Sequence, residues 1–395
     1  MRFVLVAGEA SGDALGAGLI EALRLRYPHA QYFGVGGPLM VQAGLVQWFS
    51  SDELAVMGLF EVLKHLPRLL KKRAQVLRQT LDLHPSAFIG IDAPDFNLAI
   101  ERKLKALGVC TAHYVSPSIW AWRSDRAAKI ALSTDLVLCL FPFEPALYAQ
   151  YGVHAVFVGH PLADQFPLEP APTFARIALG LPLNTPILAL LPGSRLSEIK
   201  QLGKDFLDAG ALLKKSLPRL TVIAPMANPR ARAAFEAQMT PAHSLVLFDG
   251  QAQLVLQAAD AVVVASGTAT LEAALARKPM LVAYRLNALT YWLARKFGLL
   301  KTKYFSLPNK LAERALVPEL EQQWVTPQAI AQAIAPALTD GASPELLSAY
   351  HTIHLKLRRD ASQSAAHAIA QLLEQVAPFH PEQERDKPRS TDRRR

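Results

Sequence analysis

The chain is poor in cysteine and contains no long apolar segment. Its 395 residues include two cysteines, Cys110 and Cys139, without the CxxC spacing of a metal or redox pair. Each lies in an apolar, strand-like run, so we expect buried free thiols in a reducing compartment. No run approaches the roughly 20 apolar residues that span a bilayer, and the N-terminal stretch does not have the form of a signal peptide. The sequence therefore predicts a soluble or peripheral protein.

Charged residues make up only 19% of the chain, whereas hydrophobic residues make up 51%, which is enough for large cores. The length favours about two domains. The net charge of +9 indicates an anionic partner, which could be nucleic acid, acidic lipid or a phosphorylated small molecule. Residues 377–395 mix both charges without apolar periodicity, and we expect them to form a disordered tail.

Short apolar runs alternate with stretches of helical period along most of the chain. Continuous apolar strands, each followed by a helix, are typical of parallel sheets covered on both faces. We predict an α/β protein of two doubly wound, Rossmann-like domains facing a cleft, linked through the proline-rich segment 161–186. The expected divisions are an N-terminal domain (1–165), a C-terminal domain (166–340) and terminal helices (341–376) that could pack back on the N-terminal domain or on a partner subunit. The expected strands are 3–7, 87–91, 109–115, 135–140, 187–191, 220–224, 245–248, 261–265 and 280–284.

Three loops after predicted strands have the residues of an anion site. Ligands of such sheets bind at the carboxyl ends of strands, where helix N-termini offer free amides. The candidates are Ser11, Gly12 and Asp13, then Gly193, Ser194 and Arg195, then Ser266, Gly267, Thr268 and, one turn later, Glu272. Ser11 and Asp13 could also cap the following helix.

A nucleotide explains this combination of loops. Arg195 suits a bidentate contact with phosphate, and the Glu272 carboxylate suits the two hydroxyls of a ribose. The chain has no GKS/T loop of a nucleoside triphosphate site and no GxGxxG fingerprint of a dinucleotide site. The remaining candidate ligand is a nucleoside diphosphate that carries another group.

Eight motifs, in order and spacing, resemble the lipid-A-disaccharide synthases. They cover the chain from Val6 to about Asn309 and read "GEASGD", "GVGGPLM", "MGLFEVLKHLPRLLK", "IDAPDFN", "YVSPSIWAW", "LLPGSR", "SGTATLE" and "LPN". The resemblance implies an inverting glycosyltransferase of the B type. Its N-terminal domain would bind the lipid acceptor and its C-terminal domain the UDP-sugar.

The resemblance also implies the reaction and its setting. UDP-diacylglucosamine and diacylglucosamine 1-phosphate would be joined into the β-1′,6-linked disaccharide of lipid A, with release of UDP. The enzyme would meet these substrates on the anionic, cytoplasmic face of the inner membrane. It implies a homodimer that exchanges C-terminal segments. Since the chain has no DxD motif of metal-dependent transferases, no metal or other cofactor is expected.

Inversion in one displacement requires a base that takes the proton of the acceptor hydroxyl. The resemblance points to Asp92 as this base, with Asp95 as a second choice that could orient it. Alternatively, Asp92 could merely bind loop amides and Asp95 could cap the helix beginning near residue 96. Glu9 leaves the first strand on the same rim and is an alternative base. The resemblance places Asn309 near the nucleotide, where without it we would expect a turn residue.

Residues 57–78 predict an amphipathic helix that could lie on anionic lipid. Its ordinary alternative is a helix that packs its apolar face on the sheet, and Pro67 is expected to kink or restart it. The residues expected at the membrane are Leu63, Leu66, Leu69, Leu70, Lys71 and Lys72.

Two other functions remain open at this level. A related UDP-sugar transferase or epimerase would share the nucleotide loops but act on sugars without lipid. A basic nucleic-acid-binding protein would explain the net charge, but it predicts aromatic residues interleaved with a basic patch, which the chain does not show.

Overall fold

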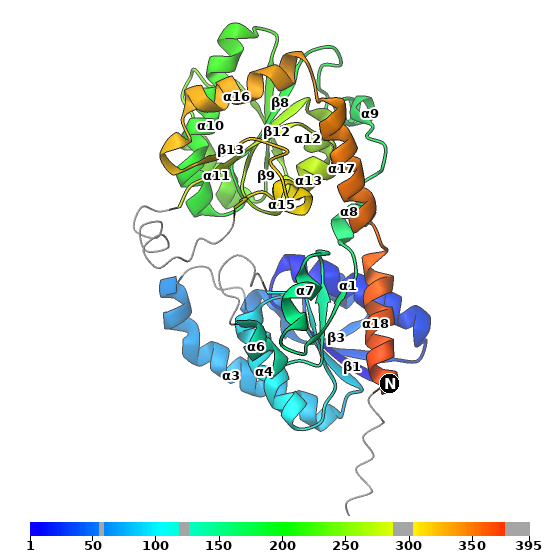
Figure 1. Ribbon diagram of the computed structural model, residues 1–395. Helices are drawn as coiled ribbons and strands as arrows, with labels where there is room; N and C mark the ends of the chain where they lie inside the picture. Colours follow the sequence, from blue (N-terminus) through cyan, green and yellow to red (C-terminus); the bar gives the residue numbers. More distant parts are fainter. Residues whose placement is uncertain (55–58, 118–125, 287–302, 376–395) are drawn as a thin grey trace, which may run out of the picture. The chain divides into compact units, whose positions relative to one another are not determined.

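The computed structural model describes residues 1–54, 59–117, 126–286 and 303–375, with side chains except those of 59–66 and 126. The chain forms two compact units, each built around one parallel sheet. Figure 1 shows helices on both faces of each sheet. The predicted fold class, two doubly wound α/β domains, is confirmed.

The sheet of the first unit has seven strands in the order β3-β2-β1-β4-β5-β6-β7. Its central strands are apolar on both faces because helices cover both. Phe3 and Leu5 of β1 face one core, shared with the helices α1 and α18, whereas Val4 and Val6 face a second core with α4. The strands are β1 Arg2–Ala7, β2 Gln31–Gly36, β3 Leu45–Ser50, β4 Ala87–Ile91, β5 Thr111–Tyr114, β6 Leu136–Cys139 and β7 His154–Phe157.

Helices of the first unit come from both ends of the described chain. α18 packs along α1, and Arg26 of α1 pairs with Glu374 of α18 at 3.6 Å. α3 continues through Pro67 as one helix, so the expected restart does not occur. The helices are α1 Ala10–Arg26, α2 Pro38–Gln42, α3 Leu59–Leu83, α4 Pro94–Ala106, α6 Arg126–Ala131, α7 Glu144–Ala149 and α18 Ala361–Gln375, with the 3₁₀ turn Ser51–Glu53.

The sheet of the second unit has six strands in the order β10-β9-β8-β11-β12-β13. The strands are β8 Ile187–Leu191, β9 Thr221–Met226, β10 Val246–Asp249, β11 Ala261–Ala265, β12 Met280–Tyr284 and β13 Glu319–Glu321. The helices are α8 Pro161–Gln165, α9 Pro172–Ala178, α10 Leu196–Ser216, α11 Pro229–Glu236, α12 Ala252–Ala258, α13 Thr268–Leu275, α15 Leu307–Ala312, α16 Pro327–Thr339 and α17 Pro344–Leu357, with the 3₁₀ turn Gln322–Trp324.

The chain passes between the units at Val158–Gly159 and again at Arg359–Asp360. The first passage comes before the expected boundary at residue 165, because α8 contacts α13 and α17 of the second unit. Segment 161–186, expected as a linker, instead carries α8 and α9 within the second unit. The terminal helices divide, since α17 belongs to the second unit and α18 to the first.

Both cysteines are buried and free, as predicted, and burial raises the pKa of the Cys110 thiol to about 12. In the part of the chain that the structure describes, no helix is long and apolar enough to cross a membrane.

Candidate active site

In the first unit, the strand order reverses between β1 and β4, and this switch point is where such sheets bind ligands. Ala7 of β1 pairs with Ile91 of β4, so the next residues, Gly8 and Asp92, leave the sheet side by side. A side chain at Gly8 would meet the Cβ of Ala93 at 2.8 Å, which shows how closely the two loops approach. Glu9 and Asp92 therefore lie on adjacent loops at one rim.

The backbone turns sharply at Asp92. Asp92 and Ala93 both have positive φ, 50° and 44°, and Ala93 is the N-cap of α4. The Asp92 amide donates to the Tyr114 carbonyl at 2.8 Å, while the buried Asn97 amide donates to the Asp92 carbonyl at 2.9 Å and to Val6 at 3.1 Å. These bonds hold the turn from both sides.

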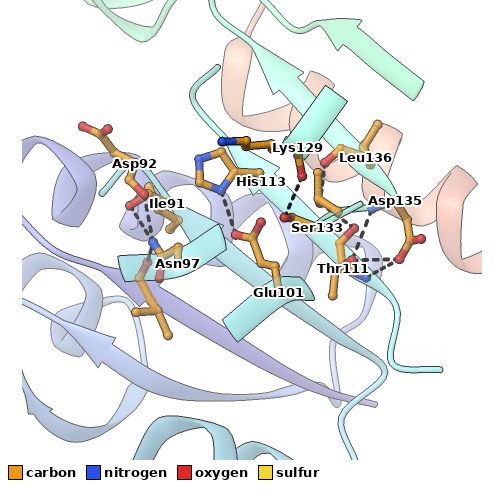
Figure 2. A network of polar contacts seen from close by, with 12 residues as sticks. Ile91, Asp92, Asn97, Glu101, Thr111, His113, Lys129, Ser133, Asp135 and Leu136 are labelled. Carbon is orange, nitrogen blue, oxygen red and sulfur yellow. Dashed lines mark hydrogen bonds and ion pairs between the residues drawn. The ribbon is translucent and has the colours of Figure 1, made fainter. Parts of the chain in front are cut away.

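The side chain of Asp92 points away from this network, as Figure 2 shows. It is half-buried, and among the described residues its carboxylate has no hydrogen-bond partner. Glu9 is exposed at the N-cap of α1, without a side-chain cap. Either carboxylate can accept a proton at the rim.

Asp95 is exposed in the first turn of α4. Its carbonyl accepts a hydrogen bond from Nη2 of Arg73 at 2.7 Å, and that guanidinium lies 5.6 Å from the Phe96 ring. Burial lowers the pKa of Arg73, and the Asp95 charge opposes this shift. The sequence did not identify Arg73 as a candidate site residue, because a lone arginine within an amphipathic helix carries no signal of its own.

Asp13 has a structural position that the sequence did not indicate. It is buried, and its two oxygens accept from the amides of Gly37, Leu39 and Met40 at 2.7–3.0 Å. The carboxylate therefore holds the start of α2, and both of its oxygens are engaged there. Ser11 and Asp13 do not cap α1, because the helix already begins at Ala10; Ser11 is exposed and Gly12 is buried.

A buried Glu–His pair lies beneath the Asp92 loop (Figure 2). Glu101 of α4 and His113 of β5 are fully buried, with Oε1 and Nδ1 2.7 Å apart. Burial raises the pKa of Glu101, and His113 opposes this shift. The pair packs over Gly90, where an added Cβ would lie 2.0 Å from Glu101 Oε1. It fixes α4 to the sheet directly below the loop.

The switch point of the second unit lies between β8 and β11. Val264 of β11 pairs with Leu191 of β8, and this register brings the loops containing Gly193 and Ser266 together. The phosphate-type loops predicted from the sequence therefore meet at the second switch point.

Arg195 is the N-cap of α10, and its side chain is 73% exposed. Glu198 orients it, accepting from its Nη1 at 3.1 Å and from the amides of Ser194 and Arg195 at 3.1 and 3.3 Å. Gly193 has φ 116°, and a side chain there would collide with Glu198. Glu198 was missed, although its position three residues after the N-cap is that of a capping-box acceptor.

Ser266 connects this rim to the segment that contains Phe305, because its hydroxyl donates a hydrogen bond to the Phe305 carbonyl at 2.7 Å. Gly267, with φ 154°, is the N-cap of α13, which begins at Thr268. Glu272 is half-buried on α13, and burial raises its pKa. Among the described residues, no hydrogen bond to its carboxylate is found, so both oxygens can accept from a ligand.

Asn309 is buried, and its amide is fully used inside its own loop. Its Nδ2 donates to Val317 and to Glu319 at 2.9 and 2.8 Å, and its Oδ1 accepts from the amides of Leu316 and Val317. This contradicts a direct nucleotide contact of the side chain, and Asn309 instead shapes the loop. Glu319, which the sequence did not suggest, also accepts from the amides of Phe305 and Ser306.

The residues expected at the membrane differ in exposure. Leu70 is 50% exposed and Lys71 is exposed, whereas Leu69 is half-buried. Lys72 is half-buried and pairs with Glu53 at 2.8 Å, so it serves the fold. The side chains of Leu63 and Leu66 lie outside the described residues, as does the "IWAW" segment.

Within the described ranges, no group of three or more His, Cys, Asp or Glu could hold a metal ion. The switch point of the first unit offers the carboxylates of Glu9 and Asp92. That of the second unit offers Arg195, the N-termini of α10 and α13, and the half-buried carboxylate of Glu272.

This fold is the B-type glycosyltransferase fold. Similar solved structures include the calicheamicin glycosyltransferase CalG4 (TM-score 0.58, 16% identity, covering 95% of this chain and 99% of that one) and MurG of Acinetobacter baumannii (0.53, 17%, 94% and 99%). A UDP-GlcNAc 2-epimerase from Neisseria meningitidis bound to UDP-GlcNAc is equally similar in fold (0.62, 12%, 94% and 100%), so the fold alone does not choose between transfer and epimerisation.

The sequence makes this choice. The family model for lipid-A-disaccharide synthetase matches residues 3–373, and the chain belongs to this family. The lipid-A-disaccharide synthase of Xylella fastidiosa (strain M12) is 52% identical over 382 residues, covering 95% of this chain and 98% of that one. That of Xanthomonas campestris pv. campestris (strain 8004) is 51% identical, covering 95% and 86%. The protein is thus a glycosyltransferase of lipid A biosynthesis that takes a UDP-sugar and a lipid-phosphate sugar, as the motifs predicted.

Proposed function

We propose that the protein joins UDP-2,3-diacylglucosamine to 2,3-diacylglucosamine 1-phosphate by a single inverting displacement, with roles divided between the two switch points. The observation that carries this proposal is the register of the sheets. It places the Asp92 loop beside the Glu9 loop in one unit, and the Arg195 loop beside the Ser266 loop in the other.

Asp92 is the proposed base for the acceptor 6-hydroxyl. Its carboxylate is half-buried and turned out of the hydrogen-bond network, while its backbone is held at both N–H and C=O. A fixed backbone with an available carboxylate suits a group that must take one proton at a defined place. Glu9 is the alternative, and Asp95 would act by its charge beside Arg73.

The second unit is proposed to hold UDP. Arg195 and the N-termini of α10 and α13 would bind the diphosphate and offset the charge that develops on departing UDP. Backbone amides and hydroxyls of the two loops would donate further hydrogen bonds, from Gly193, Ser194, Ser266, Gly267 and Thr268. Glu272 would accept from the ribose hydroxyls. In this account, the protein's own cations and dipoles stabilise the leaving group.

The chain is further proposed to bind the cytoplasmic face of the inner membrane peripherally, through the face of α3 that carries Leu70 and Lys71. Leu70 is half exposed there next to the exposed Lys71, and the whole chain carries a net charge of +9. Two free, buried thiols fit a reducing compartment. Sedimentation with anionic vesicles, weakened by salt and by Lys71→Glu, would support this placement, whereas equal binding to neutral vesicles would contradict it.

A homodimer with exchanged C-terminal segments is also proposed. α18 packs on α1 through alanines and Ile369, and an identical helix from a second chain would satisfy the same contacts. Light scattering coupled to size-exclusion chromatography distinguishes a dimer from a monomer.

The direct test is mass spectrometry of the products formed from both acylated substrates in detergent, with and without a chelator. A tetraacyl disaccharide phosphate plus UDP in both conditions would support the reaction and the proposed stabilisation of UDP. Product only after addition of a divalent ion would overturn the role given to Arg195 and the helix termini. Turnover of unacylated sugars alone would overturn the substrate assignment.

A further inference from the structure

An open apolar groove lies between α3 and α4 of the first unit and has a volume of about 390 Å³. Its walls include Leu70, Leu77 and Leu81 of α3 and Ala99 and Ile100 of α4. The two helices contact one another, and their shared core lies below the groove. The groove is thus a surface channel with a packed floor.

One residue in the wall of the groove, Arg73, connects it to the start of α4, just after the Asp92 loop. Arg73 lines the groove, and its Nη2 donates to the carbonyl of Asp95, three residues after Asp92. On α4 the groove is lined by Ala99, Ile100 and Lys103, and Lys103 lies eight residues beyond Asp95, which corresponds to about 12 Å of helix. A ligand whose polar end lies at Asp92 could therefore place an extended tail along α4.

The charges along the groove favour an anionic amphiphile. Arg73, Arg78 and Lys103 line it together with one acidic residue, Asp82. Arg78 and Lys103 are exposed, and the buried Nε of Arg73 has no hydrogen-bond partner among the described residues. Apolar walls edged by cations suit a fatty chain attached to a negatively charged head.

We propose that this groove holds one fatty acyl chain of the acceptor sugar. The inference rests on the proposed function, in which Asp92 takes the proton of the acceptor hydroxyl and the donor lies in the second unit. The groove belongs to the unit that carries Asp92, and Arg73 in its wall is hydrogen-bonded to the backbone of Asp95, in the first turn of the helix that follows Asp92. It therefore serves the acceptor and sets which acyl lengths are used.

The test compares acceptors that differ only in acyl length, using wild type and Ala99→Phe, which places a ring in the groove. Each methylene buried contributes about 0.8 kcal/mol, so kcat/KM of the wild type should rise up to about fourfold per methylene until the groove is full. Ala99→Phe should end this rise at a shorter chain and leave short-chain acceptors unaffected. Ala106→Phe, on an exposed position at the end of the same helix, should retain the wild-type profile.

A second measurement does not depend on a variant. An acceptor with a photoreactive group at the end of one acyl chain should crosslink wild type within 77–81 or 99–103. The groove assignment would be overturned if Ala99→Phe lowered kcat/KM equally for all acyl lengths. Crosslinks confined to other segments would overturn it as well. Failure of wild type to form any disaccharide would instead refute the proposed function, so the two failures are distinguishable.

Discussion

Asp92 and Ala93 both adopt a left-handed backbone conformation at the end of β4. Left-handed conformations of non-glycine residues are destabilising by roughly 1–3 kcal/mol, and two of them, Asp92 and Ala93, follow each other here. The bonds from Asn97 and to Tyr114 maintain them. Because backbone atoms and Asn97 hold the turn, the Asp92 carboxylate is left without a hydrogen-bond partner among the residues that the structure describes.

Asp92→Asn should reduce kcat by about 10²–10⁴-fold, because the amide cannot take the proton although it has the same shape. The thermal unfolding temperature should stay close to that of wild type, since the carboxylate has no described partner to lose. Asp95→Asn serves as the comparison and should reduce kcat much less. Near-normal turnover of Asp92→Asn would move the base to Glu9.

Glu272→Gln should weaken UDP binding by about tenfold, since the loss of charged hydrogen bonds to ribose outweighs the remaining neutral ones. Calorimetric titration with UDP measures this. Affinity of the wild type should also fall as pH decreases through the raised pKa of Glu272, because the protonated carboxyl accepts fewer hydrogen bonds.

The same substitution should stabilise the protein at neutral pH. Since burial raises the pKa of Glu272, the folded state binds the proton more tightly, so the free energy of unfolding falls as pH rises through that pKa. Glutamine removes this pH-dependent loss. The gain in the free energy of unfolding should vanish below pH 4.5, the ordinary pKa of a glutamate, because Glu272 is then protonated in the folded and the unfolded state alike. A gain that persists at lower pH would contradict the explanation.

Sequence predicted the position of a candidate loop well where its motif follows a strand, but it could not show where a polar side chain turns inward. The loops of Asp92 and Arg195 follow buried strands, and register brings each beside its predicted neighbour. Asp13 and Asn309 lie in equally suggestive motifs, but Asp13 binds amides of a segment 24 or more residues away and Asn309 binds amides 7 and 8 residues further along the chain. Only tertiary structure reveals whether such a group faces a ligand or a loop.

At the scale of elements, strands that read as continuous apolar runs were predicted correctly, from β1 to β12. Four strands were not found: β2, β3, β7 and β13. β2 is interrupted by glycine and β3 by polar residues, β7 is an edge strand that is only partly buried, and β13 is an edge strand of three residues. Edge and short strands depend on pairing more than on their own hydrophobicity, which explains the misses.

Two glycines provide a matched test of how tightly the elements pack. Gly90→Ala should prevent stable folding or greatly lower the unfolding temperature, because its Cβ would lie 2.0 Å from Glu101 and 2.8 Å from the Asn97 Cβ. Gly210→Ala, in the interior of α10, meets no atom closer than 3.5 Å and should stabilise the protein by about 0.5–1 kcal/mol. Thermal unfolding of both variants decides this, and a tolerated Gly90→Ala would show that Glu101 can move away.

At the scale of the whole molecule, α18 completes the first core although it follows the second unit in sequence. Helical periodicity predicted a terminal helix there, but it could not show which sheet the helix covers. Its alanine-rich face, with Ala365, Ala366 and Ala368, fits closely on α1, and such complementarity is a property of two segments together.

Ile369→Ala should lower the stability of the first unit by about 2–5 kcal/mol, because Ile369 is fully buried in its core. Hydrogen exchange should show lost protection in β1 and β4 but not in β8 and β11. Leu355→Ala, at a side chain that is 51% exposed on α17, should change stability by no more than about 0.5 kcal/mol. Uniform loss of protection in both sheets would show that the units do not unfold separately.

The double passage of the chain between the units also sets an order of assembly during translation. The ribosome finishes the strands of the first unit by Phe157, but the helix that covers α1 emerges only after Asp360. At about 5–20 residues per second, the interval is roughly 10–40 s. The unit that is made first is therefore completed last, and during that delay the uncovered face of α1 is the surface that a chaperone would need to protect.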